Sequence, residues 1–222
     1  MIVAERLTKI YSIGGQELKA VRGVNFSVER GEFVSIVGHS GSGKTTLLSM
    51  IGGLTRPSYG RVLIDGTDIW SLADEELSRF RNKKIGFMFQ FSSLIPTLNV
   101  KANLLLPVAL SGRVERHHEE RAMELLERLG LEHIAGAYPS QLSGGEQRRV
   151  AVARAFINRP EIILADEPTG DLDEESEAQV MELLTRMNRK EGVTVLLVTH
   201  NRELAAQTDR ILRMRGGYLQ ES

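Results

Sequence analysis

A glycine-rich segment, "GHSGSGKT" at residues 38–45, carries the residue types that bind phosphate groups. It follows a predicted strand and leads into a predicted helix, the context in which this pattern forms a phosphate-binding loop. Glycines let backbone N–H groups turn toward a phosphate, and the helix N-terminus adds partial positive charge. An ordinary glycine turn is the alternative, with a chance match on the order of one in a hundred. The predicted nucleotide-binding residues are Gly38, Ser40, Gly41, Ser42, Gly43, Lys44, Thr45 and Thr46.

Two adjacent carboxylates, Asp166 and Glu167, end a predicted buried strand in the segment "IILADEP". The carboxyl end of such a strand lies at the sheet edge where the phosphate loop is also expected. Adjacent side chains point in different directions, so the two groups can act differently. Asp166 is predicted to bind Mg²⁺ together with the hydroxyl of Thr45, and Glu167 to polarise an attacking water as general base. A charged strand end in a turn is the alternative, which the neighbouring phosphate loop disfavours.

A second glycine pair occurs in "LSGGE" at residues 142–146. Ser143 and Glu146 form a capping-box pattern at a helix start, but this pattern does not explain Gly144 and Gly145. Exposed backbone amides at a helix N-terminus bind anions, and the anion expected in this chain is the phosphate tail of ATP. One nucleotide does not need two such loops from the same chain, so a second role must exist for this segment.

The elements that position these residues alternate between strands and helices, which indicates a sheet with covering helices. Predicted strands are residues 32–38, 84–89, 161–166, 193–200 and 209–214. Predicted helices end at Gly52 and at Gly130, begin at Ser71 with Asp74 three residues later, and span 174–190. We expect one domain over residues 1–222, with an α/β core at 1–90 and 159–222 and a helical subdomain at about 91–158.

Composition narrows the possible functions. The chain has 28 Lys and Arg residues against 29 Asp and Glu, a net charge of -1, which gives no support to a nucleic-acid partner. It has no cysteine, which excludes disulfides and thiolate metal sites. The N-terminus lacks the apolar region of a signal peptide, and no apolar run is long enough to span a membrane. We expect a soluble chain that reaches a membrane only through a partner.

Six features occur along the chain in the order seen in ATP-binding-cassette (ABC) ATPases, which the whole chain resembles: "GHSGSGKT", Gln90, "LSGGE", "IILADE", "GDLD" and His200. The resemblance implies a P-loop NTPase (RecA-like) core with a mostly parallel sheet, a small antiparallel β subdomain and an inserted helical subdomain. It also implies ATP and Mg²⁺ as ligands, and a homodimer in which two cassettes pack head to tail.

The resemblance assigns further residues. Ser143, Gly144 and Gly145 would close over the ATP that the partner's phosphate loop holds. Gln90 would contact Mg²⁺ and the attacking water, and His200 would contact the γ-phosphate. Two further residues are Asp173, which would cross the dimer interface, and Tyr11, which would stack on adenine. For Tyr11, a surface tyrosine at a strand end is the alternative.

The segments 89–110, 138–155 and 165–173 resemble the LolD/MacB type, which serves lipoprotein release and macrolide or peptide export; the FtsE type is also similar. This implies an integral membrane permease subunit with an extracytoplasmic domain, and a peripheral location on the cytoplasmic face of the cell membrane. Four positions depart from the subgroup pattern: Ser92, Ser93, Ala102 and Asp171. Two alternatives remain open. They are signalling to an envelope or division machine without transport, and a phosphate-loop kinase for a small acceptor.

Overall fold

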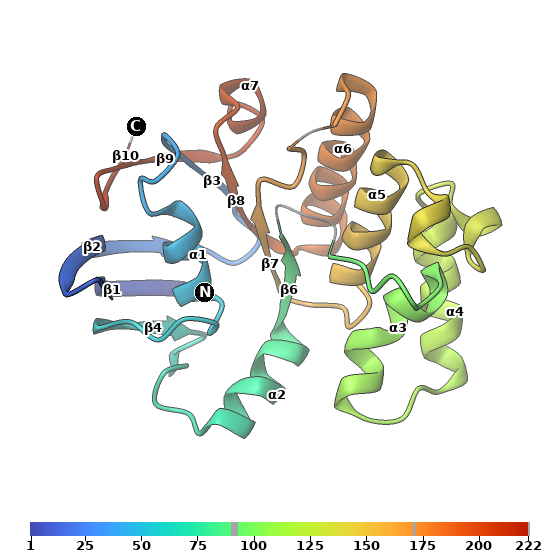
Figure 1. The fold of residues 1–222 in the computed structure, drawn as a ribbon, viewed down its shortest axis with the longest axis horizontal. Coiled ribbons are helices and arrows are strands. Elements are labelled where there is room, and N and C mark those ends of the chain that lie inside the picture. The colour runs from blue at the N-terminus through green and yellow to red at the C-terminus, as the bar shows by residue number, and fades with distance from the viewer. Residues whose placement is uncertain (90–92, 171, 222) are drawn as a thin grey trace.

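A six-stranded sheet forms the centre of the protein in the computed structural model, which describes residues 1–89, 93–170 and 172–221 (Figure 1). Its strand order is β10-β9-β3-β8-β7-β6, with parallel pairing throughout except for the final β9–β10 hairpin. The strands are β3 (Phe33–Val37), β6 (Ile85–Met88), β7 (Ile162–Asp166), β8 (Thr194–Thr199), β9 (Arg210–Arg215) and β10 (Tyr218–Glu221). The predicted mixed α/β class with a mostly parallel sheet is confirmed.

A second, antiparallel sheet lies beside the first at the N-terminal end of the chain (Figure 1). Its order is β2-β1-β4-β5, and β1 pairs along most of its length with β2. The strands are β1 (Ile2–Ile13), β2 (Gln16–Val28), β4 (Tyr59–Ile64) and β5 (Thr67–Asp68). Gly14 and Gly15 form the β1–β2 turn with φ of 57° and 80°, which a two-residue hairpin turn requires. The structure therefore contains the small antiparallel β unit that the resemblance implied.

The central sheet is buried on both faces, which explains its almost continuous apolar strands. Alternate residues of β7 belong to two different cores: Ile163 and Ala165 pack with α3, α4, α5 and α6, whereas Ile162 and Leu164 pack with α1 and the antiparallel sheet. The helices are α1 (Lys44–Ile51), α2 (Asp74–Lys84), α3 (Val100–Ser111), α4 (Arg116–Glu127), α5 (Gly144–Ala155), α6 (Glu174–Glu191) and α7 (Arg202–Ala205).

Between β6 and β7, the described residues 93–158 form only helices and loops: α3, α4, the 3₁₀ turns η1 (Glu132–Ile134) and η2 (Pro139–Gln141), and α5. The loop that leads into α3 is shaped by the fully buried side chain of Asn103. Its Oδ1 accepts a hydrogen bond from the N–H of Ile95, and its Nδ2 donates to the carbonyl oxygens of Ile95, Leu98 and Asn99. One buried amide thus fixes the entry to this helical segment.

One predicted helix start was wrong. The pair Ser71 and Asp74 predicted a helix that opens at Ser71, but α2 begins at Asp74. The Ser71 hydroxyl instead donates to the carbonyl oxygen of Asp68 at 2.7 Å, within the preceding turn. Glu76 accepts the backbone N–H of Ala73 at 3.1 Å, so the first free amide of the helix is satisfied by a carboxylate three residues further along.

Parallel pairing brings the carboxyl ends of three strands to one edge of the sheet. Val37 at the end of β3 pairs with Thr199 at the end of β8, and Asp166 at the end of β7 pairs with Val198. The loops that follow these strands begin at Gly38, His200 and Glu167, so the predicted chemistry is collected at a single edge, as expected for an open α/β sheet. Among the described residues, the helices are all too short or too polar to cross a bilayer.

We predict that Gly86→Ala destabilises the protein. A Cβ at Gly86 would lie 2.3 Å from the carbonyl oxygen of Ala155 and 2.6 Å from Cδ1 of Ile163, because α5 packs directly on β6. We expect the free energy of unfolding to fall by about 1–3 kcal/mol, the usual cost of overpacking, as measured by urea denaturation. Gly136→Ala is the control, since its Cβ would meet nothing within 4 Å. Equal stability of the two variants would contradict this packing.

Candidate functional site

The loop between β3 and α1 is held in place by close backbone contacts. A Cβ at Gly38 would lie 2.3 Å from the carbonyl oxygen of Met214, and a Cβ at Gly43 would lie 2.3 Å from that of Ala20. Gly41 and Gly43 also have φ of 74° and 105°, where side chains are rarely tolerated. The glycines of the segment are thus required for the loop to pass between the antiparallel sheet and β9.

Lys44 begins α1 and is 8% exposed. Its ammonium group donates to the carbonyl oxygens of Gly38 and His39, at 2.7 and 3.1 Å, and therefore lies across the turn of the loop. A buried ammonium beside a helix N-terminus concentrates positive charge at one point. The predicted residues of the segment from Gly38 to Thr46 thus form a compact loop around a single cation, with the geometry of an anion-binding cradle.

Asp166 ends β7 and is 7% exposed. Burial raises the pKa of its carboxyl group, and the neighbouring Glu167 charge acts in the same direction; a hydrogen bond from the Thr45 hydroxyl and the charge of Lys44 act against them. The structure thus brings Asp166 together with Thr45 and Lys44, as the sequence predicted. Its Oδ1 atom is buried and has no hydrogen-bond partner among the described residues.

These groups fit a magnesium ion. In phosphoryl-transfer sites Mg²⁺ is held by one or two protein groups, by water and by the phosphates of the substrate rather than by a full protein cage. In the described ranges no group of three or more His, Cys, Asp or Glu side chains could hold a metal unaided. A buried carboxylate oxygen without a partner beside a threonine hydroxyl is the kind of incomplete donor set that Mg²⁺ and phosphates would complete.

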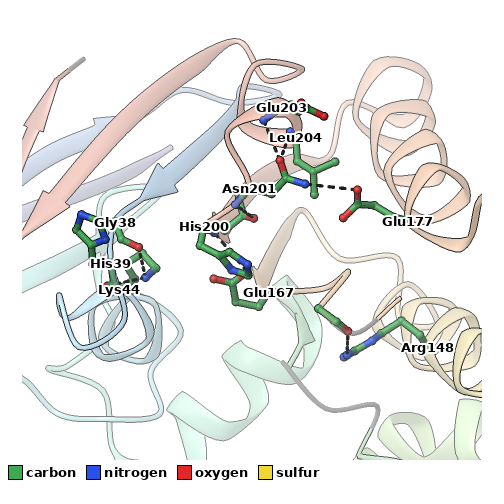
Figure 2. Close-up of polar contacts among 12 residues, drawn as sticks. Gly38, His39, Lys44, Arg148, Glu167, Glu177, His200, Asn201, Glu203 and Leu204 are labelled. Atoms are coloured by element: carbon green, nitrogen blue, oxygen red, sulfur yellow. Dashed lines mark hydrogen bonds and ion pairs between the residues drawn. The ribbon is translucent and has the colours of Figure 1, made fainter. Parts of the chain in front are cut away.

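Glu167 and His200 face each other at the same sheet edge (Figure 2). Nδ1 of His200 lies 2.9 Å from Oε2 of Glu167, and the glutamate side chain is 15% exposed whereas the histidine is 73% exposed. Glu167 has φ of 47°, an unfavourable conformation for a non-glycine residue, of the kind that concentrates at functional sites. Its backbone N–H donates to Val198, which anchors the residue to β8. The carboxylate is thus held beside a solvent-facing imidazole.

The turn after His200 is also ordered by side chains. Thr199 Oγ1 accepts the N–H of Asn201 at 3.0 Å, and Oδ1 of Asn201 accepts the N–H groups of Glu203 and Leu204 at the start of α7 (Figure 2). Capping of α7 by Asn201 fixes the residue that follows His200. This explains how a histidine with an exposed ring keeps a defined backbone position.

The segment 142–146 forms the predicted capping box. Ser143 Oγ accepts the N–H of Glu146 at 3.2 Å, and Oε2 of Glu146 accepts the N–H of Ser143 at 2.8 Å. A Cβ at Gly145 would lie 2.7 Å from Oγ of Ser176 on α6, so one glycine has a packing reason within the chain. At Gly144 a Cβ would meet nothing within 4 Å. Contacts within the described part of the chain therefore do not explain why Gly144 is glycine.

Other predicted residues lie apart from this cluster. Asp173 caps α6, where its two carboxylate oxygens accept the N–H and the hydroxyl of Ser176 at 2.9 and 3.0 Å, and these hydrogen bonds lower its pKa. Tyr11 lies on β1 with the ammonium group of Lys9 5.1 Å from its ring centroid. Gln90 lies outside the described residues.

Sequence reasoning missed Arg148. This residue of α5 is 6% exposed, and its guanidinium donates to the carbonyl oxygens of Phe89, at 2.9 Å, and Gly170, at 3.1 Å. The arginine adjoins the "SGGE" segment in sequence, but its acceptors are backbone atoms far away along the chain. No side-chain pattern could therefore have identified them.

The chain matches the family model described as "ABC transporter" over residues 21–170. The ABC transporter ATP-binding protein YknY of Bacillus subtilis, whose description calls it uncharacterized, is 44% identical over 98% of this chain and 94% of its own length. The lipoprotein-releasing system ATP-binding protein LolD of Xanthomonas campestris pv. campestris (strain 8004) is 43% identical over 100% of this chain and 92% of its own. The macrolide export ATP-binding/permease protein MacB of Rhodopirellula baltica is 42% identical, but the chain spans only 33% of its length.

The structure also superposes on one chain of a solved structure, the dimeric ATP-binding cassette MJ0796 in a post-hydrolysis state bound to ADP and Pi. The TM-score is 0.93 at 41% sequence identity, and the match covers 100% of this chain and 98% of that one. Similarity of this extent includes the central sheet, the phosphate loop and the helical segment. The chain therefore belongs to the ABC transporter family, as an ATP-hydrolysing cassette of the LolD/MacB type.

Proposed function

We propose that this ABC ATPase works as a head-to-tail homodimer that encloses two Mg·ATP and drives a membrane permease subunit. The observation that carries the proposal is the collection of Lys44, Asp166 with Thr45, and the Glu167–His200 pair at one edge of one sheet. Residues 1–90 and 159–222 form the α/β core in this proposal, and residues 91–158 form the helical subdomain.

Binding begins at the phosphate loop. The loop amides and the ammonium group of Lys44 bind the phosphates, while Tyr11 stacks on the adenine ring. Thr45 and Asp166 hold Mg²⁺, which when bound neutralises charge on the phosphate oxygens. By the resemblance alone, Gln90 would also contact this ion. Because the loop glycines are fixed by Met214 and Ala20, little reorganisation is needed when the phosphates bind.

Hydrolysis is assigned to Glu167 and His200. The Glu167 carboxylate accepts a proton from the attacking water, and general-base catalysis of this kind contributes typically 10²–10⁴-fold to the rate. Nδ1 of His200, 2.9 Å from this carboxylate, orients it, while the exposed imidazole ring is free to meet the γ-phosphate. Glu167 holds this place with a φ of 47°, a strained conformation for a non-glycine residue.

The homodimer supplies a role for the second glycine segment. In the view of Figure 1, α1 with its phosphate loop and α5 lie on opposite sides of β7. Among the described residues, no hydrogen bond joins Ser143–Gly145 to the loop 38–45. Gly144 faces open space. A partner cassette that packs head to tail would bring its bound ATP to these amides. Asp173, which bonds Ser176 beside Gly145, would cross the same interface.

A groove of about 720 Å³ supplies a site for the membrane subunit. Its apolar lining includes Leu54, Phe89 and Leu110, whose exposed fractions of 46%, 45% and 78% are high for side chains of this type. The lining also holds Arg79, which pairs with Glu75, and Arg81 and Arg154, whose guanidinium groups donate to the carbonyl oxygens of Gly53 and Ser93. We assign this groove to an apolar segment of the permease. An exposed apolar surface rimmed by charges is typical of such contacts.

Two transport processes fit the subgroup. Relatives named for lipoprotein release and for macrolide export match this chain at 42–43% identity. We propose that the chain serves one of them from the cytoplasmic face of the membrane, with a permease that has an extracytoplasmic domain.

Lys44→Ala is expected to weaken ATP binding by about ten- to hundredfold, since charged hydrogen bonds contribute about 1.5–3 kcal/mol. The measurement is equilibrium titration with a fluorescent ATP analogue. Lys101→Ala is the control, because Lys101 pairs with Glu119 on the helical segment, away from the loop. Unchanged affinity in Lys44→Ala would remove Lys44 from the site.

Glu167→Gln is expected to reduce ATP turnover by at least about a hundredfold while leaving ATP bound. Because hydrolysis no longer reopens the sandwich, the variant should change from monomer to dimer on addition of Mg·ATP, as measured by molecular mass in solution. Glu17→Gln, an exposed change on β2, is the control for both readouts. Substantial turnover in Glu167→Gln would contradict the assignment of the base.

Complementation tests the shared site directly. Ser143→Arg should block hydrolysis without changing the ATP affinity of the monomer. The Ser143→Arg and Glu167→Gln chains are mixed before ATP is added. In each mixed dimer, one of the two ATP sites then combines an intact Glu167 with an intact Ser143 from the other chain. ATPase activity should then reappear, although each variant alone is inactive. A mixture as inactive as its components would show that each chain completes its own site.

A further inference from the structure

Arg148 links three segments that are distant along the chain. It projects from α5, and its guanidinium bridges the carbonyl oxygens of Phe89, which follows β6, and Gly170, which follows Glu167. Arg148 is only 6% exposed, so its guanidinium is shielded from water. Hydrogen bonds from a charged donor are stronger in such a buried environment than in water. Its planar fork suits two acceptors on different segments, which a lysine ammonium matches less well.

The Gly170 contact is a short path to the proposed general base. The N–H of Gly170 donates to the carbonyl oxygen of Glu167 at 3.1 Å, and the N–H of Leu172 donates to Thr169 at 3.2 Å, so residues 167–170 form a closed turn. Arg148 holds this turn at the Gly170 carbonyl. A displacement of the guanidinium would therefore move the turn that sets the backbone of Glu167.

The N-terminus of α5 carries the segment proposed to meet the partner's ATP. Ser143 caps α5 five residues before Arg148, within the first two turns of the same helix. Gly145 packs on Ser176, which Asp173 caps at the start of α6. Because a hydrogen-bonded helix moves as one body, a force on Ser143–Gly145 reaches Arg148 with little loss.

We propose that Arg148 is a positioning residue that couples the two ATP sites of the dimer. Closure of α5 over the ATP of the partner subunit is transmitted through Arg148 to Gly170, and so to Glu167 in the site of the same chain. This inference rests on the proposed head-to-tail dimer. It predicts that hydrolysis at one site depends on occupancy of the other, and that Arg148 carries this dependence.

The test compares Arg148→Lys and Arg148→Gln with the matched changes Arg149→Lys and Arg149→Gln. Arg149 is the next residue of α5. Among the described residues, its guanidinium donates to the side chain of Gln179 on α6 rather than to the turn at residues 167–170. Steady-state ATPase rates of the full chain are measured against ATP concentration. Thermal unfolding and the ATP affinity of the monomer are measured on the same samples.

We expect the unmodified chain and both Arg149 variants to show a Hill coefficient near the limit of about 2 for two sites. In the Arg148 variants the Hill coefficient should fall toward about 1, and kcat should be lower. The monomer should still bind ATP normally. The double variant Arg148→Lys with Glu167→Gln should still form the ATP-dependent dimer. An unchanged Hill coefficient in the Arg148 variants, with cooperativity in the unmodified chain, would overturn the role of Arg148 and leave the dimer intact. A Hill coefficient of about 1 in the unmodified chain, with no ATP-dependent dimer, would overturn both.

Discussion

The close approach of the phosphate loop to two backbone carbonyls is the constraint on which the rest of the site depends. Gly38 lies against Met214 of the central sheet, and Gly43 lies against Ala20 of the antiparallel sheet, at distances that leave no room for a side chain. The loop is thereby held between the two sheets, and α1 leaves it with a fixed direction. Because protein interiors are close-packed, a shift of either sheet would be transmitted to the loop. The separate N-terminal sheet is therefore part of the proposed nucleotide site, even though it supplies few of the predicted ligands.

Much of this arrangement could be predicted from the sequence, because its local signals agree. The segment 38–45 combines loop glycines with a lysine and threonine at a helix start, and the nearly continuous apolar runs of β7 and β8 indicate strands buried on both faces. Once those strands are parallel and adjacent, the residues that follow them must meet at one edge. Asp166, Glu167 and His200 come together for this reason, with no need to know any side-chain contact in advance.

The remaining features depend on contacts between residues that are distant in sequence. Arg148 binds two carbonyl oxygens, and a backbone acceptor leaves no trace in the identity of the residues that carry it. Ser176 of another helix lies against Gly145, a contact that the local capping pattern could not indicate. At α2 the local pattern was misleading, since the Ser71 hydroxyl satisfies Asp68 in a turn rather than a helix start. Long-range packing and competing local hydrogen bonds are thus the two causes of what was missed.

The open surroundings of Gly144 have a consequence for how sequence variation at this position would be read. A side chain there meets nothing within 4 Å in the chain, so folding places no demand on the residue, whereas the proposed partner contact does. Variants at Gly144 would accumulate in cells as normally folded, normally abundant protein. Quality control, which recognises exposed or unfolded chain, would leave them in place, and they would occupy membrane subunits without working. Loss of function here would persist as folded, inactive protein, whereas a destabilised chain is removed by proteolysis.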